Sequence, residues 1–372
     1  MGDREPELPG FGMADSVADG FDPAKLADAI AFARDEAETG WPRDLSKGLA
    51  ASGSAEPPPW NEILGPTRPR AGPNGIILRH GRVLGSWGDI HRADMIFSVA
   101  KSYLALLAGL AVQDGLIRSL DDPVRDYAAE ASDDGFDAPQ NRGITWRHLL
   151  TQTSEWEGEL WSKPDLVDRN RQVGAGSDNS RKGTHRDLGK PGSFWEYNDV
   201  RVNRLSLSLM QVFGRPLKDV LKERIMDPIG CSGEWEWHGY RNSWTDVAGQ
   251  RLQAVPGGSH WGGGIWIATA DQIRLAELVR RNGDWNGKAV LPASWIAAIR
   301  APCDAFPQYG LLWWLNTARA QYPEVPESSF FAVGAGSNVV WIDQALEIAA
   351  VIRWIDQKKI GAFLGLVMAS LR

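Results

Sequence analysis

A serine and a lysine three residues apart open the most apolar stretch of the chain. Ser98 and Lys101 lead into a run, Tyr103–Val112, that is apolar on every side. Residues three apart lie on one face of a helix, so the Ser98 hydroxyl and the Lys101 amine can meet. We expect burial and the positive end of the helix dipole to lower the pKa of Lys101. A neutral Lys101 would then accept the Ser98 proton and activate the oxygen for attack on a carbonyl carbon.

A Ser-x-x-Lys pair also occurs by chance, and the alternative interpretation is an N-cap serine followed by a surface lysine. A surface lysine does not belong at the start of this stretch, because a helix that is apolar all round is typical of a buried element. A second candidate group, Tyr197, lies downstream in the sequence Tyr-Asn-Asp that ends at Asp199. The alternative role of Tyr197 is that of a half-buried packing aromatic.

Spacings typical of other catalytic sites are missing from the sequence. The six histidines contain no His-x-x-x-His pair, and Cys231 and Cys303 lie in no metal-ligand spacing. There is no Gly-x-Ser-x-Gly, and no Walker or dinucleotide-binding glycine pattern follows a predicted strand. We therefore predict neither a metal nor another cofactor.

Composition restricts the classes of partner. The chain has 372 residues and a formal net charge of −7, whereas nucleic-acid binding requires a basic footprint. Its longest apolar run is about half of the ~18 residues that a membrane-spanning helix needs. The first residues, Met-Gly-Asp-Arg-Glu-Pro-Glu, lack the pattern of a signal peptide. We expect a cytoplasmic protein with a small-molecule substrate and no nucleic-acid or membrane partner, and its oligomeric state stays open.

Strands are expected at the two ends of the sequence and helices between them. A hairpin is predicted from two apolar stretches, 75–79 and 82–87, that flank His80-Gly81, because the glycine supplies a positive φ. Further strands are predicted over 309–316, 329–333, 337–342 and 348–354. Helices are predicted within 22–39, with Asp22 as N-cap, and over 97–116, 145–151, 199–213, 216–226, 269–282, 292–300 and 358–371.

These elements predict an α/β (α+β) fold, in which an antiparallel sheet is flanked by terminal helices and carries an all-helical insertion. We divide the chain into an N-terminal helix and irregular arm (1–73), a sheet domain (74–97 and 265–372) and a mainly helical domain (98–264). The helical domain carries Ser98, Lys101 and Tyr197. A cleft between two such parts is a common ligand site, and we place the active site there.

Six stretches of the chain match the motifs of one family in the expected order: Ile96–Tyr103, Gly115–Val124, Ile144–Ser154, Trp195–Asp199, Gly262–Asp271 and Gly334–Asn338. They resemble the serine β-lactamase and penicillin-binding-protein superfamily. The resemblance is greatest to its class C-like branch of esterases, amidases and 6-aminohexanoate-dimer hydrolases. It covers roughly residues 75–355 and implies a β-lactamase-like fold.

The resemblance implies a role for each matching residue. Ser98 would be the nucleophile that is acylated, and Lys101 its base partner. Tyr197 would carry a proton between nucleophile, leaving group and water. The backbone N–H groups of Ser98 and Ser337 would form the oxyanion hole, where each donor stabilises the tetrahedral intermediate by about 3–4 kcal/mol.

Two positions depart from the family's motifs. Asp199 stands where the family has asparagine or serine, and Gly334 stands where Lys-Thr-Gly or His-Thr-Gly begins. In relatives that process penicillins, this cation helps to bind the substrate carboxylate. Its loss, together with a nearby acid, predicts a neutral or cationic ester or amide as substrate.

Five residues are expected to contact the substrate: Asp199, Trp156, His260, Gly334 and Gly336. Ordinary packing is the alternative for Trp156 and His260. The segment 154–195 is predicted to be a partial lid over the cleft, and its charged part, 165–190, to be a solvated loop.

The sequence thus predicts a serine hydrolase that works through a Ser98 acyl-enzyme. One alternative is a β-lactamase or D-alanyl peptidase, against which the expected lack of export argues. The other alternative is a catalytically silent binding member of the fold. The joint presence of Ser98, Lys101 and Tyr197 argues against silence, although fold alone does not fix function.

Overall fold

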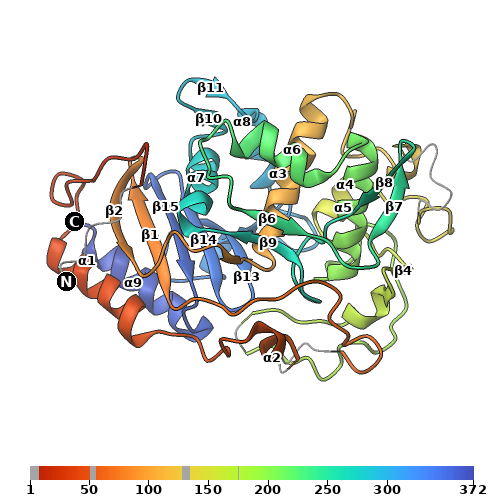
Figure 1. The fold of residues 1–372 in the computed structure, drawn as a ribbon, viewed down its shortest axis with the longest axis horizontal. Helices are drawn as coiled ribbons and strands as arrows, with labels where there is room; N and C mark the ends of the chain where they lie inside the picture. Colours follow the sequence, from red (N-terminus) through yellow and green to blue (C-terminus); the bar gives the residue numbers. More distant parts are fainter. Residues whose placement is uncertain (1–7, 51–55, 128–134, 175) are drawn as a thin grey trace.

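A six-stranded antiparallel sheet forms one half of the molecule (Figure 1). The computed structural model describes residues 8–50, 56–127, 135–174 and 176–372. The strands are β1 (Asn74–Arg79), β2 (Arg82–Trp87), β12 (Trp314–Leu315), β13 (Phe330–Gly334), β14 (Asn338–Asp343) and β15 (Ile348–Arg353). Their order is β12-β13-β14-β15-β1-β2, so the early hairpin joins the sheet through the pairing of β1 with β15.

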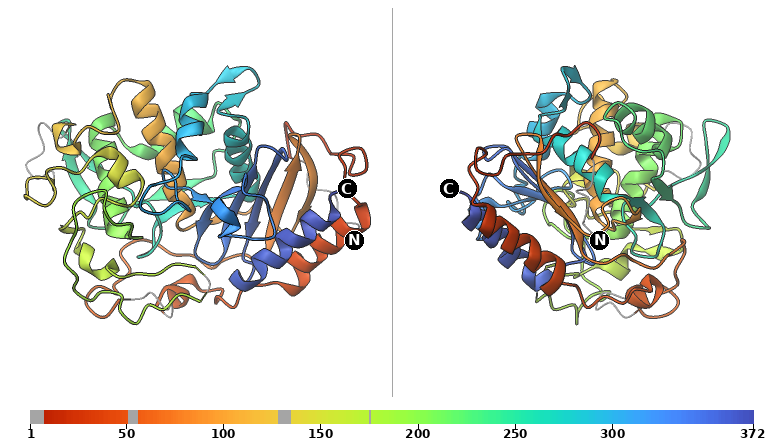
Figure 2. Two further views of the ribbon diagram at one scale, coloured as in Figure 1. Left: turned by 180° about the vertical axis from the view of Figure 1, so that it is seen from behind. Right: turned by 60° about the vertical axis from the view of Figure 1, so that its left-hand side comes forward.

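Helices cover both faces of this sheet. On one face α1 (Pro23–Ala31) and α9 (Ile360–Ser370) lie side by side, as Figure 2 shows. On the other face α7 (Thr269–Arg280) packs against β14 and β15. Because neither face meets solvent, β14 and β15 are buried at every position and do not alternate between apolar and polar residues.

The other half of the molecule is mainly helical. α3 (Val99–Gln113) is buried along nearly its whole length, as expected of a helix that is apolar all round. α5 (Asp199–Phe213) and α6 (Leu217–Leu221) pack against α3, and α4 (Trp146–Leu150) packs against α5. A small sheet of β3 (Asp94–Met95), β9 (Gly264–Ile267) and β6 (Glu236–His238) lies where the two halves meet (Figure 1).

The remaining elements are short. They are α2 (Leu45–Ala50), α8 (Ala293–Ile299), β4 (Glu159–Leu160), β5 (Lys163–Pro164), β7 (Trp244–Val247), β8 (Gln250–Gln253), β10 (Asp284–Trp285) and β11 (Lys288–Ala289). Within the described ranges, no helix combines the length and the apolar character that crossing a membrane requires.

The predicted architecture, an antiparallel sheet flanked by terminal helices, is confirmed. The hairpin turns at His80 and Gly81, which have φ values of 50° and 74°. Asp22 caps α1, since its carboxylate accepts hydrogen bonds from the backbone N–H groups of Ala24 and Lys25. The division of the chain into three segments stays a prediction.

Two expectations about strands are wrong. Of the strand predicted over 309–316, only Trp314–Leu315 forms, because Leu312 has a left-handed φ of 58° that interrupts the extended backbone. The region 98–264 also holds several short strands, among them β6, β7 and β8. Strands of three or four residues are too short to show a clear period of two.

A buried arginine holds the chain that leads to Ser98. The Arg353 guanidinium, at the end of β15, donates hydrogen bonds to the carbonyl oxygens of Met95 and Ile267 at 3.0 and 2.8 Å. It also donates to the side-chain oxygen of Asn338 at 2.9 Å. Strands β3, β9 and β14 are thereby tied to one side chain, which fixes the backbone just before the serine.

Phe97, directly before Ser98, has a φ of 51°. A positive φ is unusual for a bulky residue and persists only where packing enforces it. The Phe97 ring meets the rings of Trp41 and Trp354 edge-on, with centroids 5.5 and 6.2 Å away. These contacts turn the chain from β3 into α3 and aim the serine side chain.

The packing of α3 yields a first prediction. A Cβ added at Gly109 would lie 2.4 Å from two atoms of the Trp295 indole, so Gly109→Ala overpacks the contact between α3 and α8. We expect a loss of about 1–2 kcal/mol in the free energy of unfolding, although alanine is the better helix former. Urea denaturation measures it. The control is Gly143→Ala, whose Cβ meets nothing within 4 Å; a Gly109→Ala protein as stable as this control would contradict the prediction.

Candidate active site

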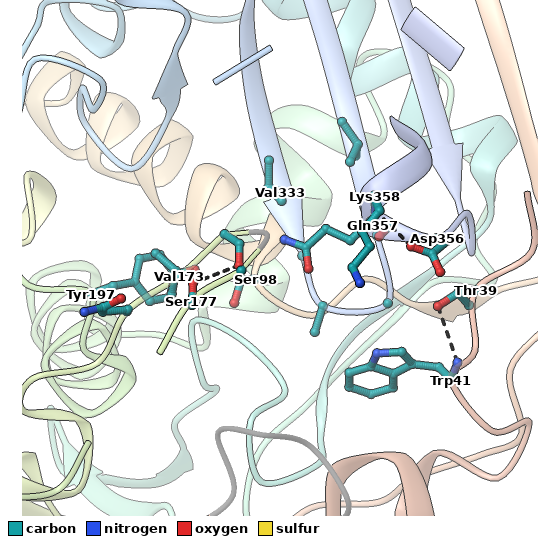
Figure 3. Close-up of a pocket in the computed structure, with 18 of the residues that line it drawn as sticks. Thr39, Trp41, Ser98, Val173, Ser177, Tyr197, Val333, Asp356, Gln357 and Lys358 are labelled. Atoms are coloured by element: carbon teal, nitrogen blue, oxygen red, sulfur yellow. Dashed lines mark hydrogen bonds between the residues drawn. The ribbon is translucent and has the colours of Figure 1, made fainter. Parts of the chain in front are cut away.

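Ser98 lies half-buried against a cavity of about 660 Å³. The helical half contributes Tyr197 and part of the 154–195 segment, and the sheet half contributes the end of β13 and the turn after it. The N-terminal arm closes a third side with Thr39, Trp41 and Pro42. Figure 3 shows Ser98 beside Tyr197, with Trp41 and Lys358 towards the opposite side.

The first turn of α3 brings the serine and the lysine together as predicted from their spacing. Lys101 Nζ donates to Ser98 Oγ at 2.8 Å, and the lysine side chain is only 2% exposed. A second, very short contact joins Lys101 Nζ to Asp199 Oδ1, which lies in the first turn of α5. The lysine is therefore held between the nucleophile and a carboxylate.

The predicted neutral state of Lys101 is wrong. Burial acts to lower the pKa of Lys101, but the charge of Asp199 outweighs it and the pKa is raised above its usual value of 10.5. Lys101 is thus an ammonium ion that donates to Ser98, and it cannot accept the serine proton in the resting state. The expectation failed because it rested on the helix alone, whereas the deciding carboxylate comes from another helix.

Asp199 is buried within a network of charged side chains and does not offer its charge to a substrate. Its Oδ2 accepts from Arg171 at 2.6 Å and lies 3.1 Å from His260 Nδ1. Burial acts to raise the pKa of Asp199, but Lys101, Arg171 and His260 together hold it well below its usual range. The predicted excess of negative charge in the cleft is therefore wrong, because three donors neutralise this acid. We call the connected set the Asp199 network: Lys101, Asp199, Arg171, Asp168, Lys182, Glu56 and His260.

Tyr197 lines the cavity next to Ser98. Its ring stacks on Trp314 with centroids 5.9 Å apart. Lys101 Nζ lies 4.9 Å from the ring centroid and the Arg171 guanidinium carbon 5.3 Å from it. Two cations this close stabilise negative charge that develops on the phenol during proton transfer.

The turn between β13 and β14 lies against the nucleophile. A Cβ at Gly334 would lie 2.2 Å from the Ile96 carbonyl oxygen and 3.1 Å from the Ser98 backbone nitrogen, so only glycine fits there. Gly336 and Ser337 have φ values of 68° and 57° and also line the cavity. The backbone at Gly334 thus lies close to the Ser98 nitrogen, and the oxyanion hole formed by Ser98 and Ser337 stays a prediction.

Two predicted substrate contacts lie elsewhere. Trp156 is 2% exposed and packs in the core, where its indole N–H donates to the Gly135 carbonyl at 2.7 Å. His260 lies in the Asp199 network, with each ring nitrogen near a carboxylate. Of the two, His260 is linked to Ser98 through Asp199 and Lys101.

Only the start of the charged run 165–190 departs from the predicted solvated loop, since many of the described residues from Gln172 onward are exposed. Asp165 and Asp168 are buried and pair with Arg169 and Arg171, whose side chains are 6% and 11% exposed. Several described residues of this run line the cavity, and the partial lid stays a prediction; they are Arg171, Gln172, Val173, Gly174, Gly176, Ser177 and Asn179. A run of charges looks solvated in sequence because its partners lie far away along the chain.

Three residues that belong to or lie against the Asp199 network were not predicted from the sequence. Arg171 and Glu56 lie in segments without periodicity, so no pattern indicated that they face the site. A Cβ at Gly258 would lie 3.0 Å from Lys101 Nζ and 3.4 Å from Ser98 Oγ. The glycine pair Gly257-Gly258 was the one available signal, since paired glycines often mark a close approach of backbone to a site.

One cluster has the composition of a metal site. Ligand atoms of Glu56, Asp168 and His260 all lie within 4.8 Å of one another. However, the Lys182 ammonium contacts both carboxylates, and His260 points its nitrogens at Glu56 and Asp199. The lysine thus supplies the positive charge that a metal would bring, and the cluster reads as an ion-pair network.

The buried acid yields a second prediction. Asp199→Asn leaves Lys101 and Arg171 without their shared carboxylate, so we expect a loss of about 3–5 kcal/mol in the free energy of unfolding near neutral pH. Asp199 has a lowered pKa in the folded state, so its stabilisation is present above its unfolded pKa, usually 3.8, and is lost as the pH falls. Urea denaturation at several pH values should therefore show a smaller loss of stability on acidification in Asp199→Asn than in wild type. An equal loss in both proteins would contradict the assignment.

Comparisons with known proteins agree with this arrangement. The family model described as beta-lactamase matches residues 76–359. An uncharacterized protein of Alkalihalophilus pseudofirmus is 24% identical over an alignment of 267 residues, which covers 64% of this chain and 66% of that protein. The chain thus spans just under two thirds of that relative's length.

Solved structures share the fold at low identity. EstCE1, a hydrolase with promiscuous acyltransferase activity, superposes with a TM-score of 0.60 at 17% identity, over 96% of this chain and 100% of that one. A penicillin-binding protein homolog from Caulobacter crescentus superposes with a TM-score of 0.60 at 14% identity, over 98% and 100%. The family match spans most of the chain, and the structures show the same fold. The chain belongs to the beta-lactamase family, within the superfamily of serine β-lactamases and penicillin-binding proteins.

Proposed function

We propose that this protein is a serine hydrolase that cleaves a neutral ester or amide through an acyl-enzyme on Ser98. The observation that carries the proposal is the 2.8 Å hydrogen bond from the buried Lys101 ammonium to Ser98 Oγ, beside a cavity that Tyr197 also lines. A silent binding member of the fold has no use for a buried ion pair directed at the serine, because burying two charges costs several kcal/mol per ion before pairing. Membership of a family of serine hydrolases supports the same reading.

The proposed acylation uses the ammonium as a donor. Ser98 Oγ forms a bond to the carbonyl carbon while the Lys101 ammonium stabilises the charge on the serine oxygen. Tyr197 carries the serine proton to the leaving alcohol or amine as the bond to that group breaks. The backbone N–H groups of Ser98 and Ser337 receive the carbonyl oxygen as it becomes an oxyanion.

The proposed deacylation reverses these roles. Water attacks the acyl carbon, the bond to Ser98 Oγ breaks, and a proton of the water returns to the serine by way of Tyr197. Lys101 stays protonated throughout, since Asp199 holds its charge. The Lys101 ammonium thus has an electrostatic role, and Tyr197 moves the proton.

The charges next to Ser98 support a neutral substrate, while Asp356 and Lys358, of opposite charge, line the opposite side of the cavity. The glycine at 334 replaces the family's cation, and a side chain there would collide with the Ile96 carbonyl. Arg171 reaches the cavity but already pairs with Asp168 and Asp199. The aromatic lining, including Trp41 and Trp314, suits an apolar acyl or alcohol group. Asp199 does not favour a cationic substrate, because its carboxylate already pairs with Lys101, Arg171 and His260.

Covalent labelling tests the nucleophile. A fluorophosphonate should add one phosphonyl mass to the peptide that contains Ser98, because only an activated serine reacts. Ser98→Ala should take up no label, while Ser102→Ala, one turn further along α3, should label like wild type provided that it folds. Labelling of Ser98→Ala would remove Ser98 from the mechanism.

Tyr197→Phe tests the proton carrier. The substitution removes one hydroxyl, so kcat for p-nitrophenyl butyrate should fall by at least ~10²-fold. The control Tyr127→Phe also removes a tyrosine hydroxyl, one that bonds to Asp122 and not to the site, and it should leave kcat unchanged. Near-normal turnover by Tyr197→Phe would show that another group moves the proton.

Substrate charge separates this proposal from a β-lactamase or D-alanyl peptidase. In this protein the carboxylate of a penicillin would lack the charge-assisted hydrogen bond that the cation of other family members provides. That bond is worth roughly 1.5–3 kcal/mol, which corresponds to about one to two powers of ten in kcat/KM. We expect kcat/KM for a penicillin to lie at least that far below the value for p-nitrophenyl butyrate. Lys358→Met controls for a carboxylate bound at the opposite side of the cavity. Equal kcat/KM for both substrates in wild type would favour the β-lactamase alternative.

A further inference from the structure

His260 has a carboxylate oxygen at each of its two ring nitrogens. Nδ1 lies 3.1 Å from Asp199 Oδ2, and Nε2 lies 2.7 Å from Glu56 Oε1. Ionised carboxylates only accept hydrogen bonds, and a neutral imidazole has a single N–H to donate. Only the doubly protonated ring can donate to both, so the geometry selects the imidazolium.

Charged groups on every side of His260 influence this proton. Burial acts to lower the pKa of His260, but the Glu56 and Asp199 carboxylates outweigh it and raise the pKa above its usual 6.5, while Arg171 opposes them. Burial also acts to raise the pKa of Glu56, but His260 and Lys182 bring it down to about 2. Glu56 therefore stays an acceptor throughout the physiological range.

Ion pairs among the outer members of the Asp199 network complete a closed ring of charged side chains. Asp168 contacts Lys182 at 3.2 Å and Arg171 at 3.3 Å, so a path of ion pairs leads from Glu56 back to Asp199. Three carboxylates (Glu56, Asp168 and Asp199) face three fixed cations (Lys101, Arg171 and Lys182), which balances the charge without His260. The proton on His260 is thus the one charge in the network that can leave near neutral pH.

Two further titratable groups lie behind the indole of Trp261, which contacts the His260 ring edge-on at 4.4 Å. Lys163 Nζ lies 5.0 Å from that indole, and burial lowers the pKa of Lys163 to about 8. Tyr240 packs on the same indole and stays neutral, because burial raises its pKa. Lys163 is therefore the other group near Glu56 that titrates in the accessible range.

The contacts of Asp199 show what the histidine does. Oδ2 receives both Arg171 and His260, which leaves Oδ1 directed at Lys101. Lys101 in turn donates to Ser98 Oγ at 2.8 Å. The orientation of one carboxylate thus depends on the histidine, and the alignment of the ammonium on the nucleophile depends on that carboxylate.

We propose that His260 is a positioning residue of the hydrolase, whose imidazolium bridges Glu56 and Asp199 and so holds Lys101 in line with Ser98. The proposal rests on the function proposed above. When His260 loses its second proton to solvent, one of the two bridges loses its donor, and the network holds the Asp199 carboxylate less firmly although Arg171 still donates to Oδ2. Glu56 and Lys182 also line a second cavity, of about 120 Å³, which gives this end of the network a route for proton exchange.

The experiment combines a titration of the ring with a pH profile of turnover. Histidine ¹³C–¹H NMR of the full chain, with the His260 signal identified by its loss in His260→Gln, reports the charge of the ring without reference to activity. We expect a midpoint above 6.5 in wild type and a lower midpoint in Glu56→Gln, which removes one charge with little change of shape. A wild-type midpoint below 6.5 would overturn the proposal even if no ester is turned over.

The profile of kcat for p-nitrophenyl butyrate then tests positioning. In wild type, kcat should fall as the pH rises, with the same midpoint as the NMR titration of His260. In Glu56→Gln this fall in kcat should occur at lower pH. His260→Gln should lose the decline and lower kcat by up to about 10²-fold, the cost of a displaced catalytic group, with KM little changed.

Two controls and the stability profile make the result decisive. His91→Gln removes an exposed histidine outside the network and should leave the profile as in wild type. Lys163→Met should keep the alkaline decline; its disappearance would assign the decline to Lys163 and overturn the proposal. A fall in kcat at the same pH in Glu56→Gln as in wild type would also overturn the proposal.

The stability of the fold gives a separate test. Because His260 has a raised pKa, its stabilisation should be present below pH 6.5 and be lost as the pH rises. Glu56→Gln should therefore reduce the change in the free energy of unfolding over this pH range.

Discussion

The buried contact between Lys101 and Asp199 is the constraint on which the rest of the site depends. Neither charge meets water, since the two side chains are 2% and 5% exposed. Removing two ions from water costs several kcal/mol each, and only close pairing with further hydrogen bonds offsets that cost. The chain supplies those bonds from Arg171, His260 and the start of α5, whose dipole favours a carboxylate in its first turn. As a result, Lys101, which donates a hydrogen bond to Ser98 Oγ, carries a positive charge.

Meeting this constraint requires parts of the chain that lie far apart in sequence. α3 provides the lysine, the 154–195 segment provides Arg171, and the turn before β9 provides His260. The segment itself has little regular structure, and it is held by a second set of buried pairs in which Arg186 contacts Glu155 and Glu196. Irregular backbone is thereby kept in place beside the cavity by charge instead of by strands or helices.

Much of the fold was predictable, because long elements carry strong patterns. The all-apolar α3, the hairpin at His80-Gly81 and the capped α1 each follow from local spacing and turn chemistry. The short strands β6, β7 and β8 were missed because pairing across the small sheets, not a local pattern, defines them. The placement of strands near both ends of the chain and of long helices between them followed from the order of these patterns.

The site was predictable where one motif carries its own geometry. Ser98 and Lys101 meet because three residues span one helical face, and Tyr197 lies next to a helix start that local sequence marks. The protonation state of Lys101 was not predictable, because it is set by a carboxylate on a different helix. Trp156 was misassigned for a related reason: an aromatic side chain in a polar segment can face the core as readily as a cleft, and sequence does not give its direction.

The N-terminal arm forms part of the cavity although it lies outside the matched family range. Thr39, Trp41 and Pro42 form one wall of the cavity, yet they lie outside the part of the chain that matches the beta-lactamase family, 76–359. In the proposed hydrolase, the groups that would break the bond and part of the wall that would contact the substrate therefore lie in separate stretches of the chain. Trp41 limits that freedom, because its ring rests on Phe97, the neighbour of the nucleophile. The Trp41 wall and the backbone just before Ser98 are therefore linked through the contact between Trp41 and Phe97.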